Sequence, residues 1–328
     1  MPSNIDTLVT VFGGSGFLGM QVTRALAKRG YRVRVACRRT NLAYRSPLMG
    51  EVGQIQVVQA NVRMPASVER ALEGADAVVN LVGVLFEQGR QRFQSLHAQG
   101  ARNIAEAAKA RGIKTFVQVS AIGADADSRS KYGRTKAEGE AAVKALIPTA
   151  TVVRPSIVFG QDDDFFNRFG ALAAHAPVLP LPGGGGTRFQ PVYVGDVAAA
   201  IATCIGDSRT AGETLELGGP TVYSFKELMQ LVLSQTQRER LLLPLPWPLA
   251  RAIGALGDLA SVLPIAPPLT SDQVELLTYD NVASGDLPGL TALGITPTAV
   301  EAAVPTYLYR YRKGGQFAEA AMIPGHVG

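Results

Sequence analysis

Short apolar runs alternate with amphipathic segments along the first half of the chain. Runs of three to seven residues rich in β-branched side chains indicate strands at 9–12, 31–37, 55–60, 77–82, 115–120 and 151–153. Apolar positions spaced three and four apart indicate helices at 17–29, 92–111 and 130–146. The alternation predicts an α/β fold: a doubly wound parallel sheet of the dinucleotide-binding type, covered by helices on both faces.

The pattern changes after Arg154-Pro155, where loops, short helices and proline clusters replace the alternation. We therefore expect a nucleotide-binding domain over residues 1–155. A smaller mixed α/β C-terminal domain is expected over residues 156–328, with a chain that can cross between the two.

A glycine-rich turn follows the first predicted strand. Its glycines fit both G-x-x-G-x-x-G (from Gly13) and G-x-G-x-x-G (from Gly14). Between a strand and a helix, such a turn brings backbone N–H groups against a pyrophosphate at the positive end of the helix. The predicted cofactor contacts here are Gly13, Ser15, Gly16, Phe17, Leu18 and Gly19. A glycine loop that holds no ligand is the alternative.

The end of the second strand distinguishes the two nicotinamide cofactors. An acidic residue there binds the adenosine ribose of NAD, whereas arginine accommodates the 2′-phosphate of NADP. This chain carries Arg38 and Arg39 at that position. Because guanidinium groups bind phosphate oxygens in a bidentate way, the two arginines favour NADPH. Two solvated loop arginines are the alternative.

Composition excludes several classes of function. Of the 328 residues, 47% are hydrophobic and 18% charged, which fits a globular protein with a large core. The net charge of +5 comes without a basic block interleaved with aromatics, so no nucleic-acid partner is expected. The two cysteines and three histidines have no metal-ligand spacing, and Asp162-Asp163-Asp164 is interpreted as a solvated loop, so no metal is expected.

These features resemble the extended or atypical branch of the short-chain dehydrogenase/reductase superfamily. The matching segments are the glycine turn, Asn61-Val62, Leu81-Val82-Gly83 and the pair Tyr132-x-x-x-Lys136. In that superfamily the lysine contacts the nicotinamide ribose and lowers the pKa of the tyrosine, which then exchanges a proton with substrate. The resemblance implies cofactor contacts at all of these positions and at Ser120 and Pro155.

The chain departs from the superfamily where catalysis is concerned. Ile122 stands where extended members carry a catalytic serine or threonine, and His97 replaces their supporting asparagine. Tyr132 and Lys136 would be catalytic only if the protein is active. We expect them to hold the nicotinamide ribose in a degenerate site without independent catalysis.

A closer resemblance joins both halves of the chain to the nucleotide-binding accessory subunits of respiratory complex I, the NADH:ubiquinone oxidoreductase. It rests on the order of the segments 154–160, 165–169, 190–197, 270–277 and 287–295. The resemblance implies a tightly held NADPH and docking among other complex I subunits, on the peripheral arm near the membrane and the quinone site. Strand character begins by Leu8 and leaves no room for a targeting segment, which favours the cytoplasmic side of the bacterial inner membrane.

Residues 241–269 are apolar, broken by prolines, and carry Trp247, Arg251 and Asp258. Such a segment is too interrupted to span a bilayer but suits an interface with a partner or with lipid headgroups; a buried helix is the alternative. The aromatic and basic residues 307–313 suit an anionic surface or a solvated tail. A free-standing NADPH-dependent reductase or epimerase remains the second hypothesis for the whole chain. Tyr132 and Lys136 favour it, while Ile122 and the apolar segment favour the subunit.

Overall fold

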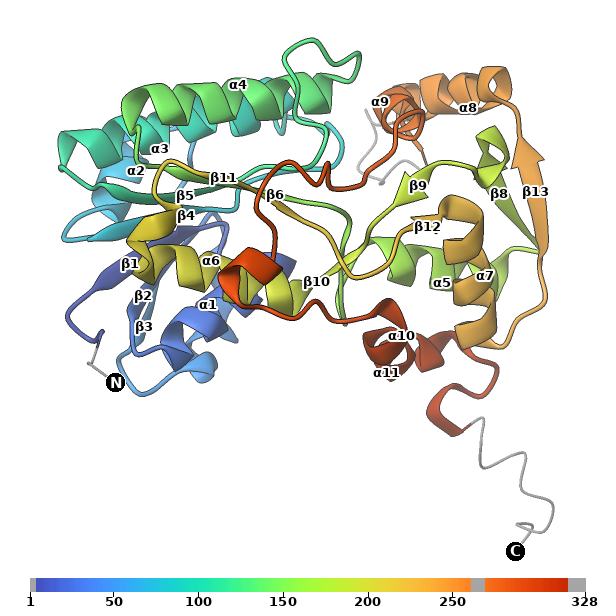
Figure 1. The fold of residues 1–328 in the computed structure, drawn as a ribbon, viewed down its shortest axis with the longest axis horizontal. Helices are drawn as coiled ribbons and strands as arrows, with labels where there is room; N and C mark the ends of the chain where they lie inside the picture. Colours follow the sequence, from blue (N-terminus) through green and yellow to red (C-terminus); the bar gives the residue numbers. More distant parts are fainter. Residues whose placement is uncertain (1–3, 261–268, 318–328) are drawn as a thin grey trace, which may run out of the picture.

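The structure, a computed structural model, describes residues 4–260 and 269–317. Its centre is a sheet of seven parallel strands in the order β11-β6-β5-β4-β1-β2-β3 (Figure 1). The strands are β1 Leu8–Phe12, β2 Arg32–Cys37, β3 Ile55–Gln59, β4 Ala77–Asn80, β5 Thr115–Val119, β6 Thr151–Pro155 and β11 Thr214–Leu217. The predicted doubly wound parallel sheet is confirmed.

Helices cover both faces of this sheet. On one face lie α1 Phe17–Lys28 and α6 Val194–Gly206, and on the other α2 Pro65–Ala71, α3 Gln99–Ala110 and α4 Lys131–Leu146 (Figure 1). A π-helical turn, Gln94–Ala98, precedes α3 within the predicted helix 92–111. Each face has its own apolar cluster, so the strands are buried on both sides.

β1 lies inside the sheet, next to the central strand β4, with β2 on its other side. The order of the strands reverses there, because the chain first builds outward to β3 and then returns to β4. In open α/β sheets a ligand binds beyond the carboxyl ends of the strands at such a switch point. The glycine turn after β1 therefore stands where a nucleotide is expected.

The chain returns to the sheet after leaving it. The strand β11 pairs with β6 through Leu215↔Val153, and α6 packs against α1, although both come from residues beyond 156. Residues beyond 156 therefore add a strand to the sheet and a helix to one of its faces, and the division into domains at residue 155, with its crossing, stays a prediction.

The remaining elements form a second, smaller layer to the right in Figure 1. Its strands pair two by two and are β7 Val158–Phe159, β8 Val178–Pro182, β9 Arg188–Phe189, β10 Val192–Tyr193, β12 Tyr223–Ser224 and β13 Leu241–Leu245. Its helices are α5 Phe165–His175, α7 Phe225–Thr236, α8 Trp247–Ala260, α9 Ser271–Leu276, α10 Val300–Ala303 and α11 Pro305–Leu308. An aromatic-rich cluster that includes Phe166 and Phe225 forms the core between α5, α7, α10 and α11, and a smaller separate cluster of Leu245, Ala250 and Val274 joins β13, α8 and α9.

Two interpretations of loops and tails are corrected here. Asp163 is only 3% exposed and accepts hydrogen bonds from the Asn167 N–H at 3.1 Å and the Tyr307 hydroxyl at 2.6 Å, so a solvated loop is wrong for this residue. Its carboxylate joins the start of α5 to α11. For the same reason residues 307–313 are not simply a solvated tail, because Tyr307 and Leu308 are buried in the core of the second layer.

The apolar segment 241–269 divides into two elements. The strand β13 pairs with β8, and α8 then packs on α9, so closely that a side chain at Gly254 would meet Ser271. Residues 261–268 of the segment lie outside the described residues. Within the two described ranges, no helix is both long enough and apolar enough to cross a membrane.

Candidate functional site

The glycine turn is too tight for side chains. Gly13 has a φ of 79°, in the region that favours glycine, and its carbonyl accepts a hydrogen bond from the Gly16 N–H at 3.1 Å. A Cβ atom on Gly19 would collide with the Gly13 carbonyl oxygen. No side chain caps the start of α1, so the N–H groups of its first turn are available to an anionic ligand.

A cavity of about 330 Å³ opens beside this turn. The predicted cofactor contacts that line it are Gly13, Ser15, Gly16, Phe17, Leu18, Gly19, Arg38, Val62, Leu81, Val82 and Gly83. Lining residues that sequence reasoning missed are Ala36, Cys37, Ala60, Val84, Gln91 and Leu96. Ala36, Cys37 and Ala60 stand at the carboxyl ends of β2 and β3, and this position in the sheet could have identified them as cavity-lining residues. The other three come from the loop after β4 and from the π-helical turn, where no motif marks them.

The other predicted contacts do not line this cavity. They are Arg39, Asn61, Ser120, Tyr132, Lys136 and Pro155. Lys136 nevertheless lies at the edge of the cavity, because it lies next to Gly83, which lines the cavity. A Cβ atom added to Gly83 would lie 3.1 Å from the Lys136 ammonium nitrogen. The Lys136 ammonium donates a hydrogen bond to the Val119 carbonyl, and the next residue, Ser120, is buried. The Ser120 hydroxyl has no hydrogen-bond partner within the described part of the chain.

The Tyr132 ring is enclosed by aromatic neighbours. Its centroid lies 5.8 Å from that of Phe93 and 5.3 Å from that of His97, both edge to face, and the Lys136 ammonium lies 5.7 Å away. Burial, helped by the charge of Asp272, raises the pKa of Tyr132 to about 12, and burial lowers the pKa of Lys136 to about 8. The raised pKa makes the phenol a weaker acid, and at neutral pH it is protonated, a form that can donate a proton but cannot abstract one.

His97 joins the loop after β4 to helix α4. Its Nε2 lies 3.1 Å from the Val84 backbone nitrogen, and its Nδ1 lies 3.1 Å from the Thr135 hydroxyl oxygen. Because the Val84 N–H can only donate, Nε2 accepts and we assign the ring proton to Nδ1. Burial, helped by the nearby Lys136, lowers the pKa of His97 to about 2, so the imidazole is neutral.

Ile122 occupies the position of the missing hydroxyl. It is 8% exposed, and its backbone N–H donates to the Pro155 carbonyl at 3.1 Å. The Ile122 carbonyl in turn accepts from the Asn281 amide at 3.4 Å. An isoleucine side chain has no hydrogen to donate to a substrate carbonyl. The site therefore combines a nucleotide-sized cavity with an incomplete set of proton-transferring groups.

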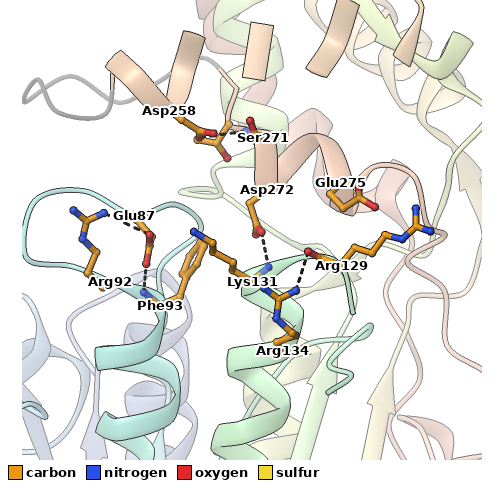
Figure 2. A pocket seen from close by; sticks show the side chains of 11 residues that line it. Glu87, Arg92, Phe93, Arg129, Lys131, Arg134, Asp258, Ser271, Asp272 and Glu275 are labelled. Atoms are coloured by element: carbon orange, nitrogen blue, oxygen red, sulfur yellow. Dashed lines mark hydrogen bonds and ion pairs between the residues drawn. The ribbon is translucent and has the colours of Figure 1, made fainter. Parts of the chain in front are cut away.

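A second cavity of about 500 Å³ lies between the start of α4 and the pair α8–α9 (Figure 2). Its lining is strongly charged and of both signs, and Figure 2 shows Asp272 pointing at the first turn of α4. The lining residues are Glu87, Arg92, Phe93, Arg129, Lys131, Arg134, Asp258, Thr270, Ser271, Asp272 and Glu275. They come from three distant stretches of sequence, so no local pattern predicts this cavity. Throughout the described ranges, this cavity included, no group of three or more histidine, cysteine, aspartate or glutamate side chains is arranged to hold a metal ion.

Comparison with known proteins places these features in a family. Residues 9–218 match the NAD dependent epimerase/dehydratase family. The chain is 35% identical to the mitochondrial NADH dehydrogenase [ubiquinone] 1 alpha subcomplex subunit 9 of Arabidopsis thaliana, covering 95% of this chain and 80% of the relative. It is also 31% identical to a ceramide reductase of Caulobacter vibrioides, covering 81% and 82%.

Among solved structures, the dTDP-glucose 4,6-dehydratase of Streptomyces venezuelae has the same fold. Its TM-score is 0.69 at 17% identity, over 94% of this chain and 98% of that one. At this identity the likeness concerns the fold alone. The chain thus belongs to the NAD dependent epimerase/dehydratase family, as an atypical short-chain dehydrogenase/reductase of the branch that contains the complex I alpha subcomplex subunit 9.

Proposed function

We propose that this protein is an NADPH-binding accessory subunit of respiratory complex I without independent catalysis. The observation that carries the proposal is the contrast within one site. Eleven of the seventeen predicted cofactor contacts line the cavity beside the glycine turn, whereas the catalytic hydroxyl position holds the buried Ile122 and burial raises the pKa of Tyr132. The subunit 9 relatives, which extend over nearly the whole chain, support the assignment to complex I.

The residues present fit a nicotinamide nucleotide. The glycine turn offers unused N–H groups to a pyrophosphate, and Arg38 with Arg39 offers guanidinium groups to a 2′-phosphate. Tyr132 and Lys136, with Ser120 and Pro155, would hold the nicotinamide end. When bound, such a nucleotide supplies a hydride donor; the role proposed here requires only that it be held.

Docking beside a membrane is supported by the surface of α8. Leu249, Leu256 and Leu259 are 52%, 67% and 73% exposed on one side of this helix, and Arg251 is exposed nearby. Leucines exposed along one side of a helix indicate a surface that another protein or a membrane covers. We propose contacts with other subunits of the peripheral arm near the quinone site, and with lipid headgroups. We further propose the cytoplasmic side of the bacterial inner membrane as the location.

The test is gentle purification from native membranes without added nucleotide. Mass spectrometry then identifies any retained nucleotide and the co-purifying polypeptides. Retained NADPH together with complex I subunits supports the proposal. Protein recovered alone from the soluble fraction, with freely exchanging nucleotide, contradicts it.

A free-standing NADPH-dependent reductase or epimerase is the second candidate. Tyr132 and Lys136 share one face of α4 next to the cavity, and a relative of 31% identity is named a ceramide reductase. The discriminating assay is NADPH oxidation with a panel of carbonyl compounds, lipid ketones included. Turnover that the Tyr132→Phe variant lacks would favour this candidate over the silent subunit.

A further inference from the structure

A tight hairpin stands at the adenosine end of the nucleotide cavity. Residues Gln88 and Gln91 exchange two backbone hydrogen bonds, of 3.1 and 2.9 Å, across the two residues between them. Gly89, the first of these two, has a φ of 54°, as a type II′ hairpin turn requires. Because Gln91 lines the cavity, this hairpin forms part of its wall.

Two arginines from different strand ends hold the hairpin. Arg38, directly after β2, donates from Nη2 to the Gln91 side-chain oxygen at 2.8 Å. Arg63, shortly after β3, donates from Nη1 to the Arg90 carbonyl at 2.8 Å. The Asn61 carboxamide oxygen, 3.4 Å from Arg63 Nε, helps to direct the second guanidinium. The two cations therefore approach adjacent residues of one turn.

Within the described part of the chain, no salt bridge pairs these two cations with an acidic side chain. Both acceptors on the hairpin are neutral amide oxygens, and none of the salt bridges found in residues 4–260 and 269–317 includes Arg38, Arg39 or Arg63. Burial lowers the pKa of Arg38, and the charges of Arg63 and Arg39 lower it further. Grouped guanidinium ions repel one another, so this arrangement favours binding of a multiply charged anion.

We propose that Arg63 and the 88–91 hairpin complete a 2′-phosphate site with Arg38, and that Arg63 is a determinant of the preference for NADPH over NADH. The inference rests on the proposed binding of a nicotinamide nucleotide. A phosphate monoester carries close to two negative charges and oxygens that match guanidinium donors. Arg63 comes from a different strand end from Arg38, so it supplies charge from a second direction while the hairpin closes the site.

The test compares dissociation constants of NADPH and NADH for the full chain and three variants. The variants are Arg63→Gln, Arg38→Gln and, as the matched control, Arg70→Gln, which removes the same charge from an exposed position in the last turn of α2. We expect Arg63→Gln to weaken NADPH about tenfold and to change NADH by less than about twofold. Arg70→Gln should leave both constants as in the unaltered chain.

The outcomes separate this inference from the proposed function. If the unaltered chain binds both nucleotides equally, or neither, the NADPH assignment itself fails. If Arg38→Gln abolishes the preference and Arg63→Gln retains it, only the role of Arg63 is overturned. Equal weakening of NADPH and NADH by Arg63→Gln also overturns it, because that result indicates a structural role.

A conservative variant distinguishes the loss of charge at position 63 from misfolding of the variant. Arg63→Lys retains the charge, and we expect it to retain more of the NADPH preference than Arg63→Gln does. Thermal unfolding without nucleotide checks that the two variants are equally folded. If lysine and glutamine reduce the preference to the same extent in equally stable proteins, charge at this position is not the determinant and the inference fails.

Discussion

The Asp272 carboxylate accepts a hydrogen bond from the Tyr132 backbone N–H at 3.2 Å, and so joins α9 to the first turn of α4. The same carboxylate accepts from the Lys131 N–H at 2.6 Å and from the Ser130 hydroxyl at 2.8 Å. It therefore places a negative charge at the positive end of α4, where such a charge is stabilising. Through this contact the C-terminal half of the chain holds the helix that carries Tyr132 and Lys136.

Replacing Asp272 by alanine should lower the free energy of unfolding by about 1–2 kcal/mol, because three donors at the start of α4 lose their acceptor. Urea unfolding measures the change. Glu275→Ala, three residues along the same short helix, is the control and should have a smaller effect. Equal losses in the two variants would show that the contact to α4 contributes nothing measurable.

The sheet could be predicted from the sequence because its signals are local. Each β-branched run forms a strand wherever it is buried on both faces, and Ser130 marks the start of α4 as its N-cap, where its hydroxyl accepts from the Gly133 N–H. The glycine turn could likewise be found, since its geometry is set by neighbours within a few residues, and Arg38 could be found from its place directly after β2, although its guanidinium is held by the distant Gln91.

The parts that escaped prediction depend on distant contacts. Asp163 belongs to a run of aspartates that is typical of a solvated loop, and its burial depends on Tyr307, 144 residues away. Gln91 and Asp272 have no motif of their own and reach their sites only after the fold is complete. A pattern that extends over ten or twenty residues carries no information about such partners.

A buried ion pair links α4 to β6 beneath the candidate site. Glu140 accepts two hydrogen bonds from Arg154, at 2.9 and 2.6 Å, and the Glu140 side chain is 9% exposed. We expect Glu140→Ala to lower the free energy of unfolding by about 3 kcal/mol, because it leaves a half-buried guanidinium without its main partner. Chemical denaturation measures this loss.

The exposed pair Asp207–Arg209 provides the contrast, since the Arg209 side chain is 87% exposed. Arg209→Ala should have no measurable effect on stability, because solvent screens the charges. A Glu140→Ala variant as stable as Arg209→Ala would show that the neighbouring Glu216, which also raises the pKa of Arg154, replaces the lost charge.

His97 should make stability depend on acid pH. Its pKa is about 2 in the folded protein against the ordinary 6.5, so between these values the unfolded chain binds a proton that the folded protein does not. Stability therefore rises with pH across this range and is lost as pH falls below about 6.5, by at most about 1.4 kcal/mol per unit. The measurement is the difference in unfolding free energy between pH 7 and pH 5.

In His97→Asn this difference should shrink, whereas the exposed His175→Asn should retain it. The comparison removes the contribution of carboxylates, which titrate alike in all three proteins. An unchanged pH dependence in His97→Asn would mean that the ring is accessible to protons in the folded state, and that the hydrogen bond from Val84 does not keep Nε2 unprotonated.

The exposed leucines of α8 should govern attachment to the membrane fraction. Leu256 and Leu259 are 67% and 73% exposed, and burying each against lipid or a partner would contribute about 1.5–3 kcal/mol. Replacing both by glutamate should thus reduce recovery with membranes at least about tenfold. The control is Leu48→Glu, since Leu48 is 82% exposed in the short 3-10 helix Ser46–Met49 between β2 and β3, two strands that lie at the opposite end of the molecule from α8 (Figure 1). Unchanged recovery of the double variant would indicate that α8 faces water in the assembled state, and that docking uses another surface.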